Sequence, residues 1–258
     1  MKRLYLFVLL AVVSSILKAQ PLAQRLDSLL SNDPMLRTSE VGITVFDLTT
    51  GESLFQYQDE KLYRPASTEK VVTSVTALAT LGLDYTMDTR LQYTGKIEND
   101  TLKGNLYLVG GFDPEFMDED LDSLVDVIAQ SGIRYIADTL AADVSMMDSV
   151  YWGNGWSWDD VPDSFQPYMS PLMLNRGCVD VTVIPAEKDS LPIIECVPAS
   201  DYYQVDNDGV SNNPQAGNLR ITRNWLHNGN QIHVTGNVSK KTTRTLSIYT
   251  SKDFFFHT

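Results

Sequence analysis

Cysteine, histidine and positive charge are all scarce in this chain of 258 residues. It has two cysteines, three histidines, and 20 Lys plus Arg against 33 Asp plus Glu, for a formal net charge of −13. Nucleic-acid binding relies on clustered Lys and Arg that contact phosphate, and the sequence has no basic stripe with interleaved aromatics. We therefore expect no nucleic-acid partner. His227, His233 and His257 lack metal-ligand spacing, so we expect neither a metal nor a cofactor.

Long hydrophobic runs are also missing, apart from one at the start. The chain begins Met1-Lys2-Arg3, continues through the mostly apolar run Leu4–Leu17 and reaches a small-residue site at Ala19-Gln20. This order of segments is typical of a secretory signal peptide. The run is shorter than the ~20 apolar residues that a spanning helix needs. We expect an exported protein of the periplasm or cell envelope, without a stable membrane span.

The two cysteines, Cys178 and Cys196, leave their redox state open. A disulfide persists in an exported protein, but the sequence does not fix the Cα separation that a bridge requires. A bridge and two buried free thiols are equally compatible with this sequence.

The segment Ser67-Thr68-Glu69-Lys70 places a hydroxyl and an amine three positions apart. Residues with this spacing share one face of a helix, so Lys70 can accept the Ser67 proton as the oxygen attacks a carbonyl. Pro65 suits a helix start and Gly82 a helix end. A stripe of apolar residues at helical spacing predicts a buried face: Val71, Val75 and Leu78, with Val72 and Ala79 beside them.

The rest of the chain falls into two regions that differ in hydrophobic periodicity and in turn residues. An amphipathic segment, Leu22–Leu30, precedes a β-hairpin pattern in 41–47 and 53–57. Beyond Gly82 the sequence changes to short strand-like runs separated by Gly, Asn, Asp and Pro, with one helix predicted over Leu121–Gln130. The runs are Thr89–Tyr93, Leu102–Val109, Asp180–Ile184, Leu219–Arg223 and Gln231–Val234.

The last residues predict a strand over Thr245–Tyr249 and a helix entry from Ser251. Three consecutive phenylalanines, Phe254 to Phe256, would leave an apolar surface with nothing after it to cover it. We expect a chain that is cut short.

Several motifs together resemble the S13 peptidases, the D-alanyl-D-alanine carboxypeptidase/endopeptidase family also called class C low-molecular-mass penicillin-binding proteins. The resemblance begins at Pro65-Ala66-Ser67-Thr68-Glu69-Lys70, continues in the same order and covers about residues 40–258. The later motifs are Ala77–Gly82 with Thr89-Arg90-Leu91, Leu106–Pro114 with Phe112 where a glycine is common, Gly155–Asp160, and Tyr168–Asn175.

The resemblance implies an α/β fold: a transpeptidase-like domain of the DD-peptidase/β-lactamase type, an antiparallel sheet flanked by helices, with a large β-rich insertion. It implies Ser67 as nucleophile, Lys70 as general base, peptidoglycan stem peptides as substrate and β-lactams as acylating inhibitors. The expected divisions are a signal peptide at 1–19, the Ser-Lys part of the transpeptidase-like domain at 20–83, the insertion at 84–240 and a return to the first domain at 241–258.

Two further family motifs, S-x-N and K-T-G, are expected downstream of the insertion, and the chain ends before either. Ser211-Asn212-Asn213 spells S-x-N inside a predicted loop of the insertion, and Lys241-Thr242-Thr243 has Thr in place of the Gly that close substrate approach needs. We discount both and expect very weak or absent acylation by this chain.

Other residues have structural explanations that we favour. Trp152, Trp156 and Trp158 could line a sugar or peptide subsite, but packing of the insertion is the preferred interpretation. The acidic run over 118–126 fails the EF-hand pattern at Ser123 and Ala129, and suits a helix start.

Two alternatives to the serine carboxypeptidase remain. One is a non-catalytic envelope module that binds peptidoglycan or a partner through the insertion. The weaker one is a β-lactamase or esterase that uses the same nucleophile.

Overall fold

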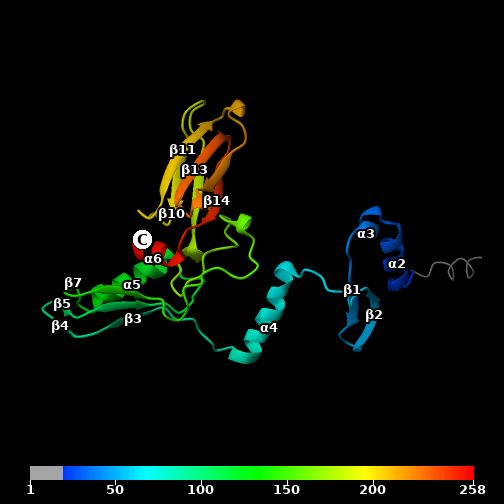
Figure 1. Ribbon diagram of the computed structural model, residues 1–258, viewed down its shortest axis with the longest axis horizontal. Helices are drawn as coiled ribbons and strands as arrows, with labels where there is room; N and C mark the ends of the chain where they lie inside the picture. Colours follow the sequence, from blue (N-terminus) through cyan, green and yellow to red (C-terminus); the bar gives the residue numbers. More distant parts are fainter. Residues whose placement is uncertain (1–19) are drawn as a thin grey trace, which may run out of the picture. The chain divides into compact units, whose positions relative to one another are not determined.

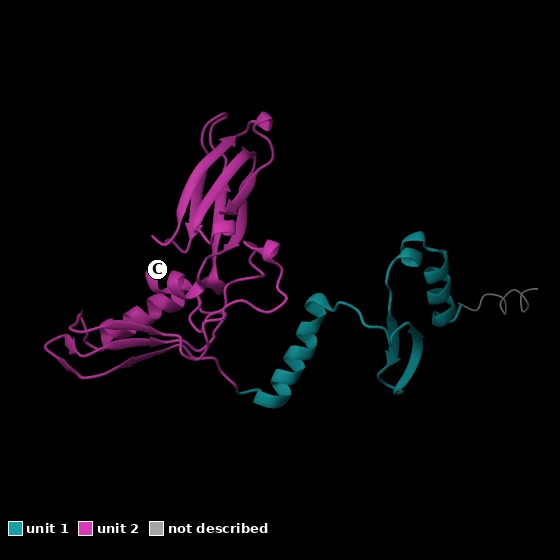
Figure 2. Ribbon diagram, in the orientation of Figure 1, with its two compact units in different colours: residues 1–84 teal, residues 85–258 magenta. Residues whose placement is uncertain are grey.

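The computed structural model describes residues 20–258. The expected signal peptide, 1–19, lies outside the described residues. The chain divides into two compact units, with the boundary between Asp84 and Tyr85 (Figure 2). Within the described residues, no helix is long and apolar enough to cross a membrane.

The first unit contains the elements that lead to the Ser-Lys motif (Figure 1). Asp47 closes the turn of its hairpin, since the carboxylate accepts a bond from the Thr49 N–H at 2.8 Å and the Asp47 carbonyl accepts one from the Gly51 N–H at 2.8 Å. The hairpin is antiparallel, as the sequence predicts. The elements are α2 (Leu22–Asn32), α3 (Pro34–Thr38), β1 (Ile43–Asp47), β2 (Glu52–Tyr57), the 3-10 turn η1 (Ala66–Thr68) and α4 (Glu69–Leu81).

Helix α4 ends where the sequence predicts but does not bury its apolar stripe. Gly82 adopts a φ of +84° and donates its N–H to the Leu78 carbonyl at 3.1 Å, which is a glycine helix end. No residue of α4 is buried: Val71 is 66% exposed and Val75 is 60% exposed. The predicted buried stripe is therefore wrong for the described chain. Periodicity identifies the face that could pack, but not whether a partner surface is present.

The second unit begins with two small sheets and a helix. The sheet orders are β3-β6-β8 and β4-β5-β7, each with one antiparallel and one parallel pairing. Leu102, Leu106 and Ile133 form a shared core. The predicted helix is present, and its first turn carries three carboxylates as expected. The elements are β3 (Arg90–Tyr93), β4 (Lys96–Glu98), β5 (Thr101–Lys103), β6 (Leu106–Val109), α5 (Asp118–Gln130), β7 (Tyr135–Ile136) and β8 (Leu140–Asp143).

Two further sheets, β10-β9-β14 and β11-β13-β12, share the largest core of the second unit. Strand β9 alternates as a half-buried strand should: Val179, Val181 and Val183 are fully buried, and they join Ile232 and Val234 of the other sheet in one cluster. The strands are β9 (Cys178–Ile184), β10 (Ile193–Val197), β11 (Gln204–Ser211), β12 (Arg220–Arg223), β13 (Gln231–Val238) and β14 (Thr242–Ser247). Two short 3-10 turns precede β9, η2 (Trp158–Asp160) and η3 (Asn175–Gly177), and two lie between later strands, η4 (Pro214–Ala216) and η5 (Trp225–His227).

The last helix, α6 (Ser251–His257), buries two of its three phenylalanines in the second unit. Phe254 is fully buried in the core of the two sheets, Phe255 is 3% exposed in a second cluster with Phe116, and only Phe256 is half exposed. The expectation of three uncovered phenylalanines is wrong, because consecutive helical positions point toward different cores. Residues 241–258 also differ from the expected return to the first domain, since β14 pairs with β9 inside the second unit.

Candidate active site

The Ser-Lys pair lies at the junction of η1 and α4. Ser67 is in the 3-10 turn and Lys70 in the first turn of the helix, and the Lys70 Nζ lies 3.4 Å from the Ser67 Oγ. The helical spacing therefore brings the two groups together on one face, as predicted. This separation is at the long end of the hydrogen-bond range, and such contacts between a base and its nucleophile are often long without a bound substrate.

The backbone before Ser67 is held in an unusual conformation. Ala66 has a φ of +46°, in the left-handed region that a residue with a Cβ rarely adopts. The turn after it is closed by Thr68, whose N–H and hydroxyl both donate to the Pro65 carbonyl. Strained residues of this kind cluster at functional sites when the surrounding contacts hold them. The strain at Ala66 supports a functional position at Ser67.

Tyr63 fixes the segment that enters this turn. Its hydroxyl contacts the carbonyls of Val41 at 2.8 Å and Gln58 at 3.0 Å. Its ring covers Gly42, where a Cβ would come within 2.6 Å of the ring. Desolvation of its hydroxyl raises the pKa of Tyr63. Sequence reasoning missed this anchor, because a single Tyr after a hairpin carries no local signal.

Both members of the pair are exposed to solvent in the described structure. A lysine acts as a general base only when its amine is neutral, and burial and nearby cations favour the neutral amine. In the described structure the nucleophile and the base lie close together, but solvent reaches both of them. Exclusion of water, which strengthens the electrostatic stabilisation of a transition state, is not provided by these surroundings.

The two sequences that mimic family motifs lie in the second unit. Ser211 is fully buried, and its hydroxyl accepts a bond from the Ala186 N–H at 3.0 Å. Lys241 is exposed immediately before β14. Both residues belong to the second unit and Ser67 to the first.

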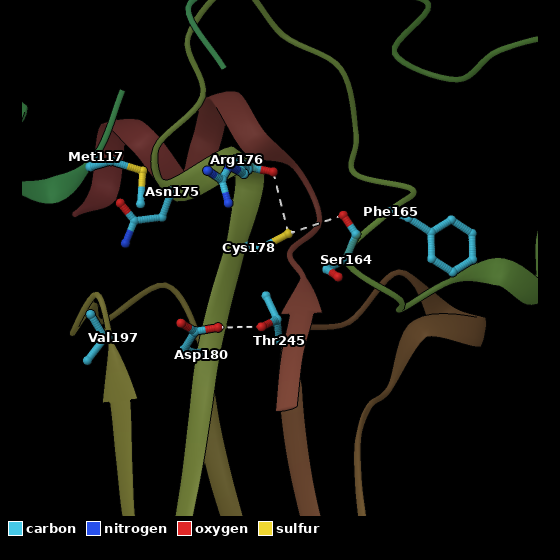
Figure 3. A pocket seen from close by; sticks show the side chains of 9 residues that line it. All are labelled: Met117, Ser164, Phe165, Asn175, Arg176, Cys178, Asp180, Val197 and Thr245. Atoms are coloured by element: carbon cyan, nitrogen blue, oxygen red, sulfur yellow. Dashed lines mark hydrogen bonds between the residues drawn. The ribbon is translucent and has the colours of Figure 1, made fainter. Parts of the chain in front are cut away.

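A pocket of about 360 Å³ in the second unit has the buried Cys178 in its lining (Figure 3). Figure 3 shows the Cys178 sulfur directed toward the carbonyls of Arg176 and Ser164, which lie at 3.4 and 3.8 Å. Burial raises the pKa of Cys178 to about 12, so the nucleophilic thiolate is disfavoured. Both cysteines are free, because the register pairs Cys178 with Ser247 and Cys196 with Val181 rather than with each other.

Candidate metal ligands do not converge in the part of the chain that the structure describes. Over residues 20–258, no group of three or more His, Cys, Asp or Glu side chains could hold an ion. His233 instead contacts Asp206 of the neighbouring parallel strand at 3.1 Å.

The tryptophans fall into two groups, and the preferred packing interpretation describes only one of them. Trp152 contacts Trp156 and the buried Tyr168, with ring centroids at 5.5 and 5.3 Å. Trp158 is 67% exposed and lies beside Trp225, with centroids 5.4 Å apart. Sequence reasoning missed Trp225, because nothing local links it to a residue 67 positions earlier.

Comparisons with known proteins identify the family that the sequence resembles. The model of the D-Ala-D-Ala carboxypeptidase 3 (S13) family matches residues 22–254. A D-alanyl-D-alanine carboxypeptidase of Actinomadura sp. (strain R39) is 29% identical over 223 residues, which are 84% of this chain and 41% of the relative. The D-alanyl-D-alanine carboxypeptidase DacB of Haemophilus influenzae is 30% identical over 168 residues, covering 65% of this chain and 35% of the relative.

A solved structure confirms the predicted α/β fold class. The crystal structure of penicillin binding protein 4 (dacB) from Haemophilus influenzae matches with a TM-score of 0.72 at 23% identity, over 89% of this chain and 51% of the other. The chain spans about half the length, or less, of these relatives. With the family model matched over nearly all described residues, this chain belongs to the S13 family of D-Ala-D-Ala carboxypeptidases.

Proposed function

We propose that this chain carries the nucleophile of a serine-type D-Ala-D-Ala carboxypeptidase/endopeptidase that acts on peptidoglycan stem peptides. The observation that carries the proposal is the Lys70 Nζ 3.4 Å from the Ser67 Oγ, in a segment that lies within the match to the S13 family. The strained Ala66 and the Tyr63 anchor support it, because they hold the turn on which Ser67 lies.

The proposed reaction has two steps. In the first step, the Ser67 Oγ attacks the carbonyl carbon between two D-alanines while Lys70 accepts the hydroxyl proton. The C–N bond then breaks, and the terminal D-alanine leaves with the proton that Lys70 returns to its amine. Water then hydrolyses the ester on Ser67 and regenerates the hydroxyl. A β-lactam would follow only the first step, because its leaving group stays attached when the ring opens and the acyl group remains on the serine.

We expect this chain to acylate slowly, because both side chains are exposed. A positioned general base contributes roughly 10²–10⁴ in rate, and one oxyanion-hole donor roughly 10²–10³. We place the activity outside the cytoplasm, in the cell envelope where its polymer lies, with residues 1–19 as the export signal.

A non-catalytic module that binds envelope polymer through the second unit is the second candidate. The same exposure of the Ser-Lys pair favours it, and so does the exposed Trp158, which lies beside the partly buried Trp225.

Labelling with a fluorescent penicillin separates the two candidates. The enzyme proposal predicts a slow, time-dependent covalent signal that is lost in Ser67→Ala. Ser74→Ala is the matched control, since Ser74 is an exposed serine of α4, the helix that follows the turn of Ser67, and it should label like the parent chain. No labelling of the parent chain at saturating penicillin over many hours would refute the enzyme proposal and leave the module.

A further inference from the structure

We propose that the second unit contains a binding site for an uncharged glycan chain, separate from the Ser-Lys motif. The site is a pocket of about 320 Å³ whose lining includes six aromatic side chains: Tyr151, Trp152, Trp158, Tyr168, Trp225 and Tyr249. All six belong to the second unit.

The walls of this aromatic pocket come from segments far apart in the sequence. Trp158 is on η2 and Trp225 on η5, and their rings are inclined by 33° at a centroid distance of 5.4 Å. Together they form a continuous apolar surface of two indoles. Because each indole is on a different turn, this surface exists only in the folded unit.

The floor of the pocket is held by contacts among three tyrosine rings and an arginine. Tyr168 is 5% exposed and contacts the rings of Tyr151 and Tyr249 edge-on, at 5.7 and 5.0 Å between centroids. The Tyr151 and Tyr249 hydroxyls bond each other at 3.0 Å. Arg223 lies over the Tyr168 ring at 5.9 Å and donates to the carbonyls of Ser247 and Gly229, both at 2.8 Å. A preformed floor lowers the ordering cost of binding.

The exposure of Trp158 indicates a ligand rather than a core. An indole removed from water typically buries 150–250 Å² of surface, yet Trp158 is 67% exposed and Leu226 beside it is 66% exposed. Pockets with mostly apolar walls and a few convergent polar groups are typical of small-ligand sites.

The absence of charge in the lining points to a neutral occupant. The nine lining residues are aromatic, aliphatic or, in Asn228, an amide, in a chain with a net charge of −13. A stem peptide carries carboxylates, and these would meet no cation in this lining. A pyranose ring has apolar C–H faces that pack on indoles and hydroxyls at its edge that bond amides and phenols. The hydrogen bond to Tyr249 raises the pKa of Tyr151 to about 12, so the Tyr151 phenol stays neutral.

The choice of an N-acetylglucosamine glycan rests on the proposed function, because that function places the chain on peptidoglycan. The neutral tetrasaccharide of β-1,4-linked N-acetylglucosamine is a soluble probe of this chemistry. Isothermal titration of the full chain with this probe should give saturable binding at one site. Trp158→Ala and Trp225→Ala should each weaken the affinity tenfold or more, as loss of an aromatic anchor does.

Trp156→Ala is the matched control, since Trp156 packs on Trp152 outside the lining; it should bind the probe within about twofold of the parent chain. Ser67→Ala should bind like the parent, so failure of the enzyme proposal leaves this test intact. Near-UV circular dichroism of each variant establishes that the unit is folded. Absence of saturable binding, equal affinities for the Trp158→Ala and Trp156→Ala variants, or binding of a stem pentapeptide in place of the tetrasaccharide would each overturn the proposal.

Discussion

Replacing Phe254 by alanine should destabilise the second unit far more than the same change at Phe256. Phe254 is fully buried, and its ring lies 6.3 Å from the rings of both Tyr202 and Tyr203. Phe256, two residues later on α6, is 50% exposed. The pair is a matched comparison, because the helix, the residue type and the atoms removed are the same.

The expected magnitudes follow from burial. Truncation of a fully buried Phe costs about 3–5 kcal/mol, whereas a half-exposed side chain should cost about 1 kcal/mol or less. With a urea m-value of roughly 2 kcal/mol/M, Phe254→Ala should lower the urea midpoint by about 1.5–2.5 M, and Phe256→Ala by about 0.5 M or less.

Tryptophan fluorescence is the appropriate assay. All four tryptophans lie between residues 152 and 225, inside the second unit, so their emission follows the unfolding of that unit alone. Equal midpoint shifts for the two variants would refute the assignment of α6 to this core. An unchanged midpoint for Phe254→Ala would refute it as well.

Three further predictions concern the same unit. Iodoacetamide should alkylate the partly exposed Cys196 before the buried Cys178, which should react only after unfolding. Peptide mass spectrometry measures the two alkylation rates, and equal rates would contradict the burial of Cys178. The folded pKa of Tyr151 is raised to about 12, chiefly by its bond to Tyr249, so its stabilising contribution is complete below pH 10 and lost between pH 10 and 12. The urea midpoint of Tyr151→Phe should therefore fall less than that of the parent chain between pH 9 and pH 11.5, and an identical fall would argue against the bond. Arg223→Lys should lower the free energy of unfolding by about 1.5–3 kcal/mol, which is the cost of losing a charged hydrogen bond. The reason is that lysine lacks the planar guanidinium that donates to two carbonyls at once. A urea midpoint equal to that of the parent chain would contradict this role of Arg223.

Local signals in the sequence predicted the elements around the candidate site. The hairpin turn and the glycine end of α4 follow from side chains and backbone preferences within a few residues of each other. The proximity of Ser67 and Lys70 follows from helical geometry alone. These features need no tertiary contact to be specified.

Features that depend on distant segments could not be read from the sequence. The parallel pairing of β6 with β8 joins strands separated by α5 and β7. Trp158 and Trp225 lie on two different 3-10 turns, η2 and η5, and their rings meet only in the folded unit. The same limit explains the errors at α4 and α6. An apolar stripe on a helix indicates which face of the helix can be buried. Which surface packs against that face depends on the rest of the fold.

The site of covalent attachment tests the central claim most directly. After prolonged incubation of the full chain with a β-lactam, proteolytic peptides should carry the intact mass of the opened ring on Ser67, and Lys70→Met should form far less of this adduct in the same time. An adduct on any other residue, or equal amounts in the parent and the Lys70→Met chain, would contradict a nucleophile at Ser67 that is activated by the Lys70 amine.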